Sequence, residues 1–189
     1  MRADAARNRE AVLQAAGRLF DTADDPAGVS MDDVAAAAGV GKGTLFRRFG
    51  DRAGLIRALY ELRTERMTAE LEEEGGDEGA VDAVARTMDA LLRFKIENRA
   101  LSRALESLGG GSPYTNAAYG GLHARLAALI AATRGPEAAD FLAHALLAAV
   151  RSDLVDHLAD WPDDRLKSGV QTLVRSVLRG EERGAPLCR

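Results

Sequence analysis

Hydrophobic residues recur at helical spacing along most of the chain. Within residues 7–22 an apolar stripe is formed by Val12, Leu13, Ala16, Leu19 and Phe20. Spacing of this kind predicts an amphipathic helix that turns its apolar side toward a core. The breaker-rich stretch DTADDPAG that follows predicts a loop.

The second predicted helix has a marked start and a marked end. Ser30 is suited to capping it, because Asp33 follows three residues later in a capping-box-like arrangement. Gly39 suits the left-handed conformation that ends many helices. A short third helix is predicted over about residues 41–48, and a fourth over about residues 51–73.

The remaining pattern predicts five further helices, over about residues 79–96, 98–108, 114–133, 136–159 and 163–179. The breaks are rich in glycine, proline or charge: Gly50, LEEEGGDEG, GGGSP, RGP and Asp160-Trp161-Pro162. Alanine and leucine dominate, and we find no convincing strand-like alternation. The sequence therefore predicts an all-α fold of about nine helices, with a flexible tail over residues 181–189.

The charge distribution adds a second signal. The chain has 189 residues and a formal net charge of -4, which argues against a protein that coats nucleic acid indiscriminately. Residues 41–52 nevertheless contain Lys42, Arg47, Arg48 and Arg52 against Asp51 alone. An acidic chain therefore carries one small basic segment.

That basic segment falls on two short helices joined by a tight turn. In such a pair the second helix can enter the major groove of DNA while the first crosses the backbone. We expect Lys42, Thr44, Arg47 and Arg48 on the exposed side, since Val40, Leu45 and Phe49 can anchor the helix. An arginine can pair bidentately with guanine. The alternative is that these arginines form an ordinary solvated face.

The stretch AGVGKGTLFRRFGDRAGL resembles the recognition stretch of the TetR family of bacterial transcriptional regulators, which reads close to AGVSKGTLYHHFKSKEEL. The resemblance covers about residues 7–60 and implies a dimeric DNA-binding protein, usually a repressor, that binds a palindromic double-stranded operator. The expected DNA-binding set is Ser30, Gly41, Lys42, Gly43, Thr44, Phe46, Arg47, Arg48 and Arg52, with Arg52 placed to reach a phosphate.

Three positions depart from the family's usual residues. Gly41 stands where serine is common, so a hydroxyl contact is lost. Phe46 stands where tyrosine is common, which removes one hydrogen bond to phosphate. The pair Arg47 and Arg48 replaces a commoner histidine or aromatic pair, and we expect it to favour half-sites that contain guanine.

The resemblance divides the chain into residues 7–52, a helix-turn-helix domain continued by a connecting helix 51–73, and residues 79–180, an effector-binding and dimerisation domain. The expected dimer-interface residues are Leu142, Ala145, Leu146, Ala149, Leu173, Val174 and Val177. The expected effector-binding residues are Met88, Leu92, Phe94, Leu105, Tyr114, Tyr119, Phe141 and His144. An ordinary monomer core is the alternative for both sets, and the sequence does not name the effector.

Other chemistry leaves weaker signals. Asp153, His157 and Asp160 share a possible helix face with metal-ligand spacing, but an ion-paired helix surface has the same spacing. His123 and His144 have no partner by spacing. The sequence has no phosphate-binding glycine loop, nucleophile elbow or HExxH motif. We therefore expect no metal, no cofactor and no enzymatic activity.

The location of the protein is inferred from what the sequence lacks. Cys188 is the single cysteine, so no internal disulfide can form. No secretory signal or apolar segment long enough to span a membrane is found. We expect a cytoplasmic protein with no membrane partner. Two alternatives stay open: a helical small-molecule-binding protein or enzyme with a structural N-terminal helix pair, and a regulator without a ligand.

Overall fold

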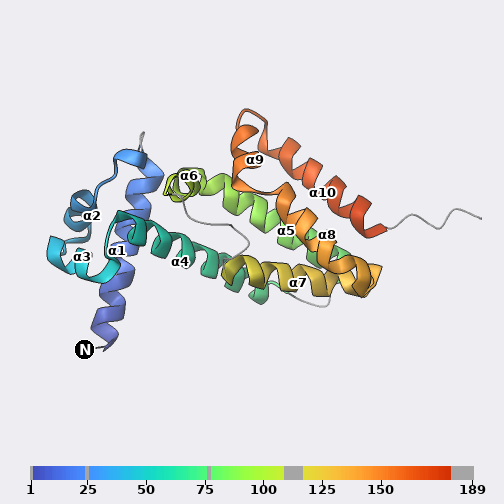
Figure 1. Cartoon of the computed structure of the whole chain (residues 1–189), viewed down its shortest axis with the longest axis horizontal. Coiled ribbons are helices and arrows are strands. Elements are labelled where there is room, and N and C mark those ends of the chain that lie inside the picture. The colour runs from blue at the N-terminus through green and yellow to red at the C-terminus, as the bar shows by residue number, and fades with distance from the viewer. Residues whose placement is uncertain (1, 24–25, 76–77, 109–116, 180–189) are drawn as a thin grey trace, which may run out of the picture. The chain divides into compact units, whose positions relative to one another are not determined.

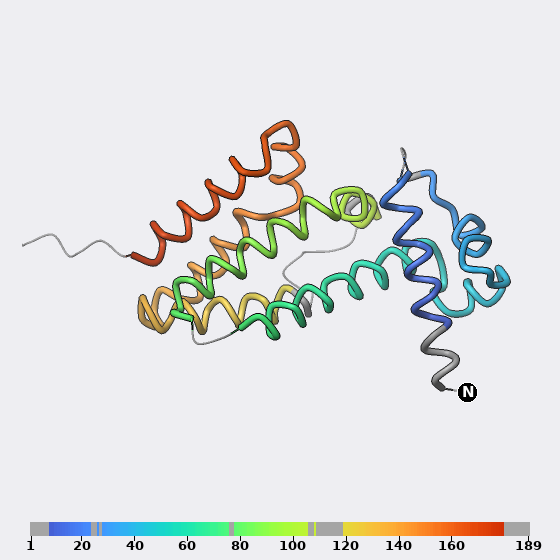
Figure 2. The backbone as a smooth tube through the Cα atoms, turned by 180° about the vertical axis from the view of Figure 1, so that it is seen from behind, coloured from blue at the N-terminus to red at the C-terminus, as the bar shows by residue number. Residues whose placement is uncertain are grey.

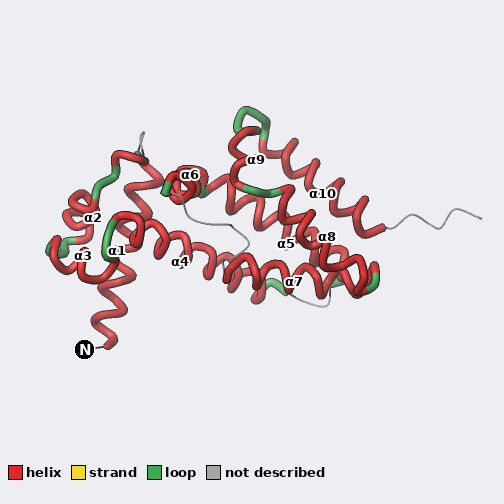
Figure 3. Tube along the Cα trace, in the orientation of Figure 1, coloured by secondary structure: helices red, strands yellow, loops and turns green. Residues whose placement is uncertain are grey.

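The computed structural model describes residues 2–23, 26–75, 78–108 and 117–179. These residues form ten α-helices and one short 3-10 helix, η1, with no strand among them (Figures 1 and 3). The α-helices are α1 (Arg2–Thr22), α2 (Met31–Ala38), α3 (Lys42–Phe49), α4 (Arg52–Glu73), α5 (Ala80–Glu97), α6 (Arg99–Ser107), α7 (Ala117–Arg134), α8 (Pro136–Ala149), α9 (Ser152–His157) and α10 (Asp163–Arg179); η1 is Pro26–Gly28. The predicted all-α fold is confirmed.

The chain forms two compact units. The first contains residues 1–69 and 97–113, and the second contains residues 70–96 and 114–189. The α6 helix therefore belongs with the N-terminal helices, although the sequence placed it in the effector domain. Leu105 packs against the core of the first unit. Helical periodicity does not show which core a helix joins, and the assignment of Leu105 to an effector site stays a prediction.

The first unit is built around α1, with α2 and α3 beside it in both Figure 1 and Figure 2. The largest side chains that are fully enclosed there are Phe20, Leu13, Leu45, Leu55 and Ile56. They come from three helices, α1, α3 and α4. The position of α3 is thus fixed by the burial of Leu45 in a core that apolar residues of the neighbouring helices share.

Two helix boundaries differ from the predictions. The α1 helix begins at Arg2 and not at residue 7, because the preceding residues contain no helix breaker. The predicted helix over residues 136–159 is broken after Ala149. In a continuous helix Leu154 would share a face with Val150, whereas here Leu154 is exposed and Val155 is buried. The break rotates the apolar face so that Val150 and Val155 both reach the core.

In the second unit, α7 and α8 form a helical hairpin joined at Gly135. Arg86 of α5 ties the end of α4 to this unit, since it donates to the backbone oxygen of Leu71 at 2.9 Å and pairs with Glu78. Hydrogen bonding and charge from Glu78 raise the pKa of Arg86. No helix of the described residues is long and apolar enough to cross a membrane.

The predicted cap of α2 is confirmed. Ser30 Oγ accepts from the Asp33 N–H at 3.2 Å, and the Asp33 carboxylate accepts from the Ser30 N–H at 2.9 Å. The hydrogen bonds from the Ser30 side chain and backbone lower the pKa of Asp33 below its ordinary value. A lowered folded-state pKa stabilises the fold above the unfolded-state pKa, and that contribution is lost as pH falls through the folded-state value.

We therefore expect Ser30→Ala to destabilise the protein at neutral pH by about 1 kcal/mol. We also expect a smaller loss of stability in the variant than in the parent as the pH falls toward the acidic pKa of Asp33, because the variant has already lost the cap. Thermal unfolding followed by circular dichroism between pH 7 and 3 measures both. Equal acid dependence in parent and variant would contradict the assignment.

Candidate nucleic-acid interface

The turn between α2 and α3 depends on the left-handed conformation of Gly39, which has φ 65°. Its N–H and that of Val40 donate to the oxygens of Ala35 and Ala36 in the last turn of α2. Gly41 is extended and caps α3 through its backbone only. The end of α3 is equally sharp, since Gly50 has φ 77° and ψ -71°, a conformation that side chains disfavour.

The α3 helix has one face in the core and one in solvent. Leu45 is 1% exposed, whereas Lys42, Gly43 and Arg47 are exposed, and Phe46 is 39% exposed. Thr44 and Arg48 lie at the edge and are half-buried. The helix therefore presents a polar and basic surface, as an element that enters a DNA groove must.

Lys42 is held by a neighbour on α2. Its Nζ lies 2.7 Å from Asp32 Oδ2, and both side chains are about 60% exposed. Exposed pairs of this kind contribute only about 0–1 kcal/mol. Breaking this pair therefore costs little, and in this structure Asp32 holds the Lys42 ammonium near the start of α3.

Arg52 has partners in the chain that the sequence did not predict. Its Nε donates to the Val29 backbone oxygen at 2.8 Å, and its Nη2 donates to Pro26 at 2.9 Å. The guanidinium also lies 5.7 Å from the centre of the Phe20 ring. In this structure the Arg52 guanidinium therefore holds the loop before α2. Its contact with a phosphate stays a prediction.

Ser30 and Gly43 complete the expected set. The Ser30 hydroxyl is engaged by Asp33 in the cap, so its place in the interface is to fix the start of α2. A Cβ added at Gly43 would have nothing within 4 Å. The protein itself leaves this position open.

The expected effector set is dispersed. Met88, Leu92 and Phe94 are buried on α5 in the second unit, and Tyr119 and His144 are half-buried. Phe141 is 74% exposed, so its assignment to an enclosed pocket was wrong: it lies on the outward face of α8. Tyr114 and the tail over residues 181–189 lie outside the described residues.

The expected dimer set divides in two. Leu146 and Val174 are 0% exposed within their own chain, so their assignment to an interface was wrong. Leu173 is 37% exposed, and the remaining members are half-buried: Leu142, Ala145, Ala149 and Val177. The helical pattern identified apolar helices correctly but did not separate the inner from the outer face.

The two histidines without a predicted partner lie together. The ring centroids of His123 on α7 and His144 on α8 are 3.9 Å apart, and Asp140 lies beside them. By contrast, Asp153, one of the three residues considered as metal ligands from the sequence, pairs with Arg151 at 3.0 Å, and this hydrogen-bonded pair lowers the pKa of Asp153. The α9 helix ends at His157, so Asp160 does not continue its face.

Residues 12–59 match the model of the family described as bacterial regulatory proteins, tetR family. This segment runs from α1 to α4 and contains the whole α2–α3 arrangement. In these residues the chain is similar to the tetR family. An HTH-type transcriptional regulator of Staphylococcus aureus (strain USA300) is 31% identical over 108 residues, which cover 57% of this chain and 58% of that protein.

Solved structures extend the similarity of fold to nearly the whole chain. A TetR-family transcriptional regulator from Syntrophomonas wolfei is 18% identical, with 95% of this chain and 98% of that chain covered at a TM-score of 0.65. The TetR-like regulator LfrR from Mycobacterium smegmatis, solved with proflavine, is 20% identical, with 92% and 97% covered at a TM-score of 0.63. At these identities the similarity concerns the fold.

Proposed function

We propose that the chain is a transcriptional regulator that reads double-stranded DNA through α3. The observation that carries this proposal is the outward face of α3, where Lys42, Thr44, Phe46, Arg47 and Arg48 surround an open Gly43 while Leu45 fixes the helix from behind. The tetR-family match of the same residues supports it. The acidic remainder of the chain disfavours nonspecific binding.

We further propose that the regulator is a homodimer formed by the outward faces of α8 and α10. Phe141 and Leu173 are among the large apolar side chains that stay exposed on these helices. A two-fold dimer presents two identical reading helices. The operator is therefore an inverted repeat with half-sites spaced by about one helical turn or a modest multiple.

The regulatory part of the proposal is repression of transcription in the cytoplasm, released by a small-molecule effector. LfrR, which has a similar fold, was solved in complex with proflavine, and this supports a small-molecule effector for the present chain. The effector would favour a state in which the distance between the two α3 helices of the dimer does not match the spacing of the operator half-sites. Only the difference in the effector's affinity for this state and for the DNA-binding state can drive the shift.

Selection of bound sequences from random DNA tests the proposal directly. The purified chain is incubated with the pool at about physiological salt, because nonspecific binding dominates at low salt. We expect enrichment of one inverted repeat with guanine in its half-sites. No enrichment by the ligand-stripped protein would contradict DNA reading, and enrichment of a single half-site would contradict the dimer. A ligand-dependent melting shift would distinguish an effector-controlled regulator from one without a ligand.

Gly43→Ala separates folding from DNA contact. The added methyl group meets no atom of the protein, so we expect the stability to rise by about 0.5–1 kcal/mol through the better helix propensity of alanine. If DNA approaches α3 closely there, operator affinity falls about tenfold, as an overpacked contact costs about 1–3 kcal/mol. Gly121→Ala on α7, also open, is the matched control. Unchanged affinity in Gly43→Ala would exclude close approach.

A further inference from the structure

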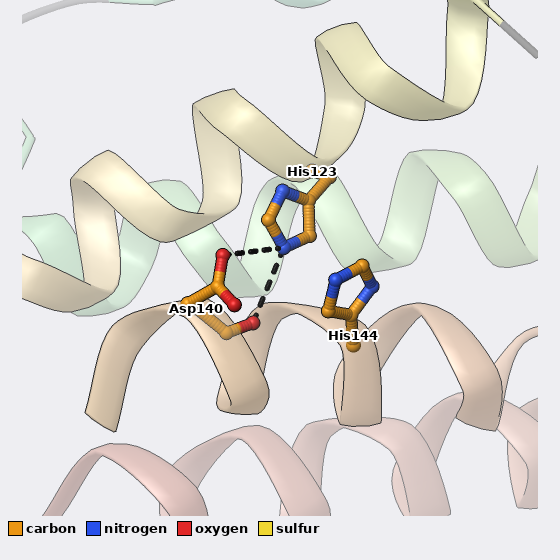
Figure 4. Close-up of side chains that lie close together, drawn as sticks. All are labelled: His123, Asp140 and His144. Carbon is orange, nitrogen blue, oxygen red and sulfur yellow. Dashed lines mark hydrogen bonds and ion pairs between the residues drawn. The ribbon is translucent and has the colours of Figure 1, made fainter. Parts of the chain in front are cut away.

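A cluster of polar side chains joins α7 to α8 within the second unit. Tyr119 and His123 lie one helical turn apart on α7, and Asp140 and His144 lie one turn apart on α8. Figure 4 shows the two imidazoles and the carboxylate turned toward one another. Four groups that can bind a cation or orient a ligand are therefore gathered from two helices.

The spacing of three of these groups suits one ion. One donor atom from each of His123, Asp140 and His144 lies within 4.8 Å of the others, and His123 Nε2 is 3.5 Å from Asp140 Oδ1. Bonds of about 2.0–2.1 Å in a tetrahedral zinc site separate neighbouring donors by roughly 3.4 Å. One pair already has this spacing, and the third donor must shift by on the order of 1 Å.

Small side-chain movements are sufficient for that shift. The imidazole rings are stacked at an angle of 29°, and turning about the Cβ–Cγ bond, which has broad minima, lets both rings aim at one point. His123 Nε2 also lies 3.2 Å from the backbone oxygen of Asp140, a contact that coordination would replace. Asp140 is 79% exposed, so an ion can enter from solvent.

Tyr119 supplies the support that such sites use. Its hydroxyl lies 2.6 Å from His144 Nδ1, and Figure 4 shows the other ring nitrogen of His144 on the side of His123. A histidine ligand commonly binds the metal through one nitrogen and a hydrogen-bond partner through the other, which fixes its tautomer and orientation. The hydroxyl of Tyr119 is in the position of that partner.

We propose that His123, Asp140 and His144 bind a divalent transition metal of the zinc class, with Tyr119 orienting His144 from outside the coordination sphere. Two imidazoles and one carboxylate suit Zn²⁺ and its neighbours in the first row, whereas Mg²⁺ prefers oxygen ligands. Three protein ligands leave a coordination position for water. The ion bridges α7 and α8, and the site does not depend on the proposed reading of DNA.

Cobalt absorption provides the test. The full chain carrying Cys188→Ser, which removes the single thiol, is stripped with a chelator and titrated with Co²⁺. We expect the visible bands of a four-coordinate site to saturate at one ion per chain and to be displaced by Zn²⁺ but not by Mg²⁺. Zn²⁺ should also raise the melting temperature by mass action. Absence of saturable binding overturns the proposal.

Variants locate the ion. His123→Gln, His144→Gln and Asp140→Asn should each weaken Zn²⁺ binding by more than the 10–100-fold expected when an outer-shell partner such as Tyr119 is changed to phenylalanine. Asp140→Asn keeps the test decisive if a histidine variant misfolds, because that side chain is largely exposed. His157→Gln, an exposed histidine on α9, is the matched control. Equal binding in the three ligand variants, or an equal loss in His157→Gln, overturns the site.

Discussion

Changing Arg47 and Arg48 together to alanine should remove sequence-specific binding to the selected operator while the helices stay folded. Each bidentate arginine–guanine pair contributes about 1–3 kcal/mol of base discrimination. Losing both lowers specific affinity by a factor on the order of 10² or more. Neither side chain is needed for the core, since Arg47 is exposed and Arg48 lies at the edge of the helix.

Fluorescence anisotropy with the operator and with a scrambled duplex separates this loss from a general loss of positive charge. The double variant Arg93→Ala/Arg134→Ala makes the same change in charge at exposed positions of the second unit and should retain specificity. If the Arg47→Ala/Arg48→Ala protein keeps the parent's base preferences, the two arginines form a solvated face and the reading of guanine is wrong.

The helix pair α2–α3 could be predicted from the sequence because the residues that fix its ends and its buried face lie close together in the chain. Ser30 and Asp33 cap α2 from three residues apart, and Gly39 ends it through its own backbone conformation. Leu45 faces the core, whereas Lys42, Gly43 and Arg47 on the same helix are exposed. Signals of this kind are contained in a few consecutive residues, so they can be recognised without knowledge of the tertiary structure.

The partners of Arg52 within the chain could not be predicted, for the opposite reason. Its position at the start of α4 is compatible with a phosphate contact, but its partners are backbone oxygens of Pro26 and Val29. Backbone acceptors carry no side-chain signature in a sequence. Only the folded path of the loop before α2 shows that they lie within reach of the guanidinium.

The His123–His144 pair shows what a sequence reading could have used. Both histidines lie at similar distances on either side of Gly135, where α7 turns into α8. An antiparallel helical hairpin brings such positions together. The spacing rules that search for ligands on one helix therefore missed a cluster that two helices build jointly. They pointed only to Asp153, His157 and Asp160, a set that the sequence did not favour as a metal site and whose helix ends at His157.

Among the polar side chains of the first unit, Arg63 is the one whose loss we expect to weaken the unit most. Its Nη1 donates to Asn98 Oδ1 at 2.5 Å and to Asp21 Oδ1 at 2.9 Å, while its Nη2 donates to Asp21 Oδ2 at 2.7 Å. Arg63 thus ties α4 to the end of α1 and to the residue before α6. Asn98 is only 6% exposed.

Arg63→Leu should lower the free energy of unfolding by about 2 kcal/mol. A hydrogen bond to a charged group contributes about 1.5–3 kcal/mol, and the partly exposed Asp21 bonds count for less because solvent screens them. Arg66→Leu, on the same helix, is the matched control. Its pair with Glu10 is exposed on both sides, so the expected loss is below about 1 kcal/mol.

Urea unfolding at neutral pH, followed by far-ultraviolet circular dichroism, compares the two variants. If Arg63→Leu loses more free energy of unfolding than Arg66→Leu, the hydrogen bonds of Arg63 hold α6 in place. The pattern of apolar residues does not reveal such an attachment. Equal losses would mean that Leu101 and Ala104, which are buried in the same core, hold α6 by apolar contact alone. In that case the apolar periodicity of α6 is enough to explain its position, and the hydrogen bonds of Arg63 do not hold the helix in place.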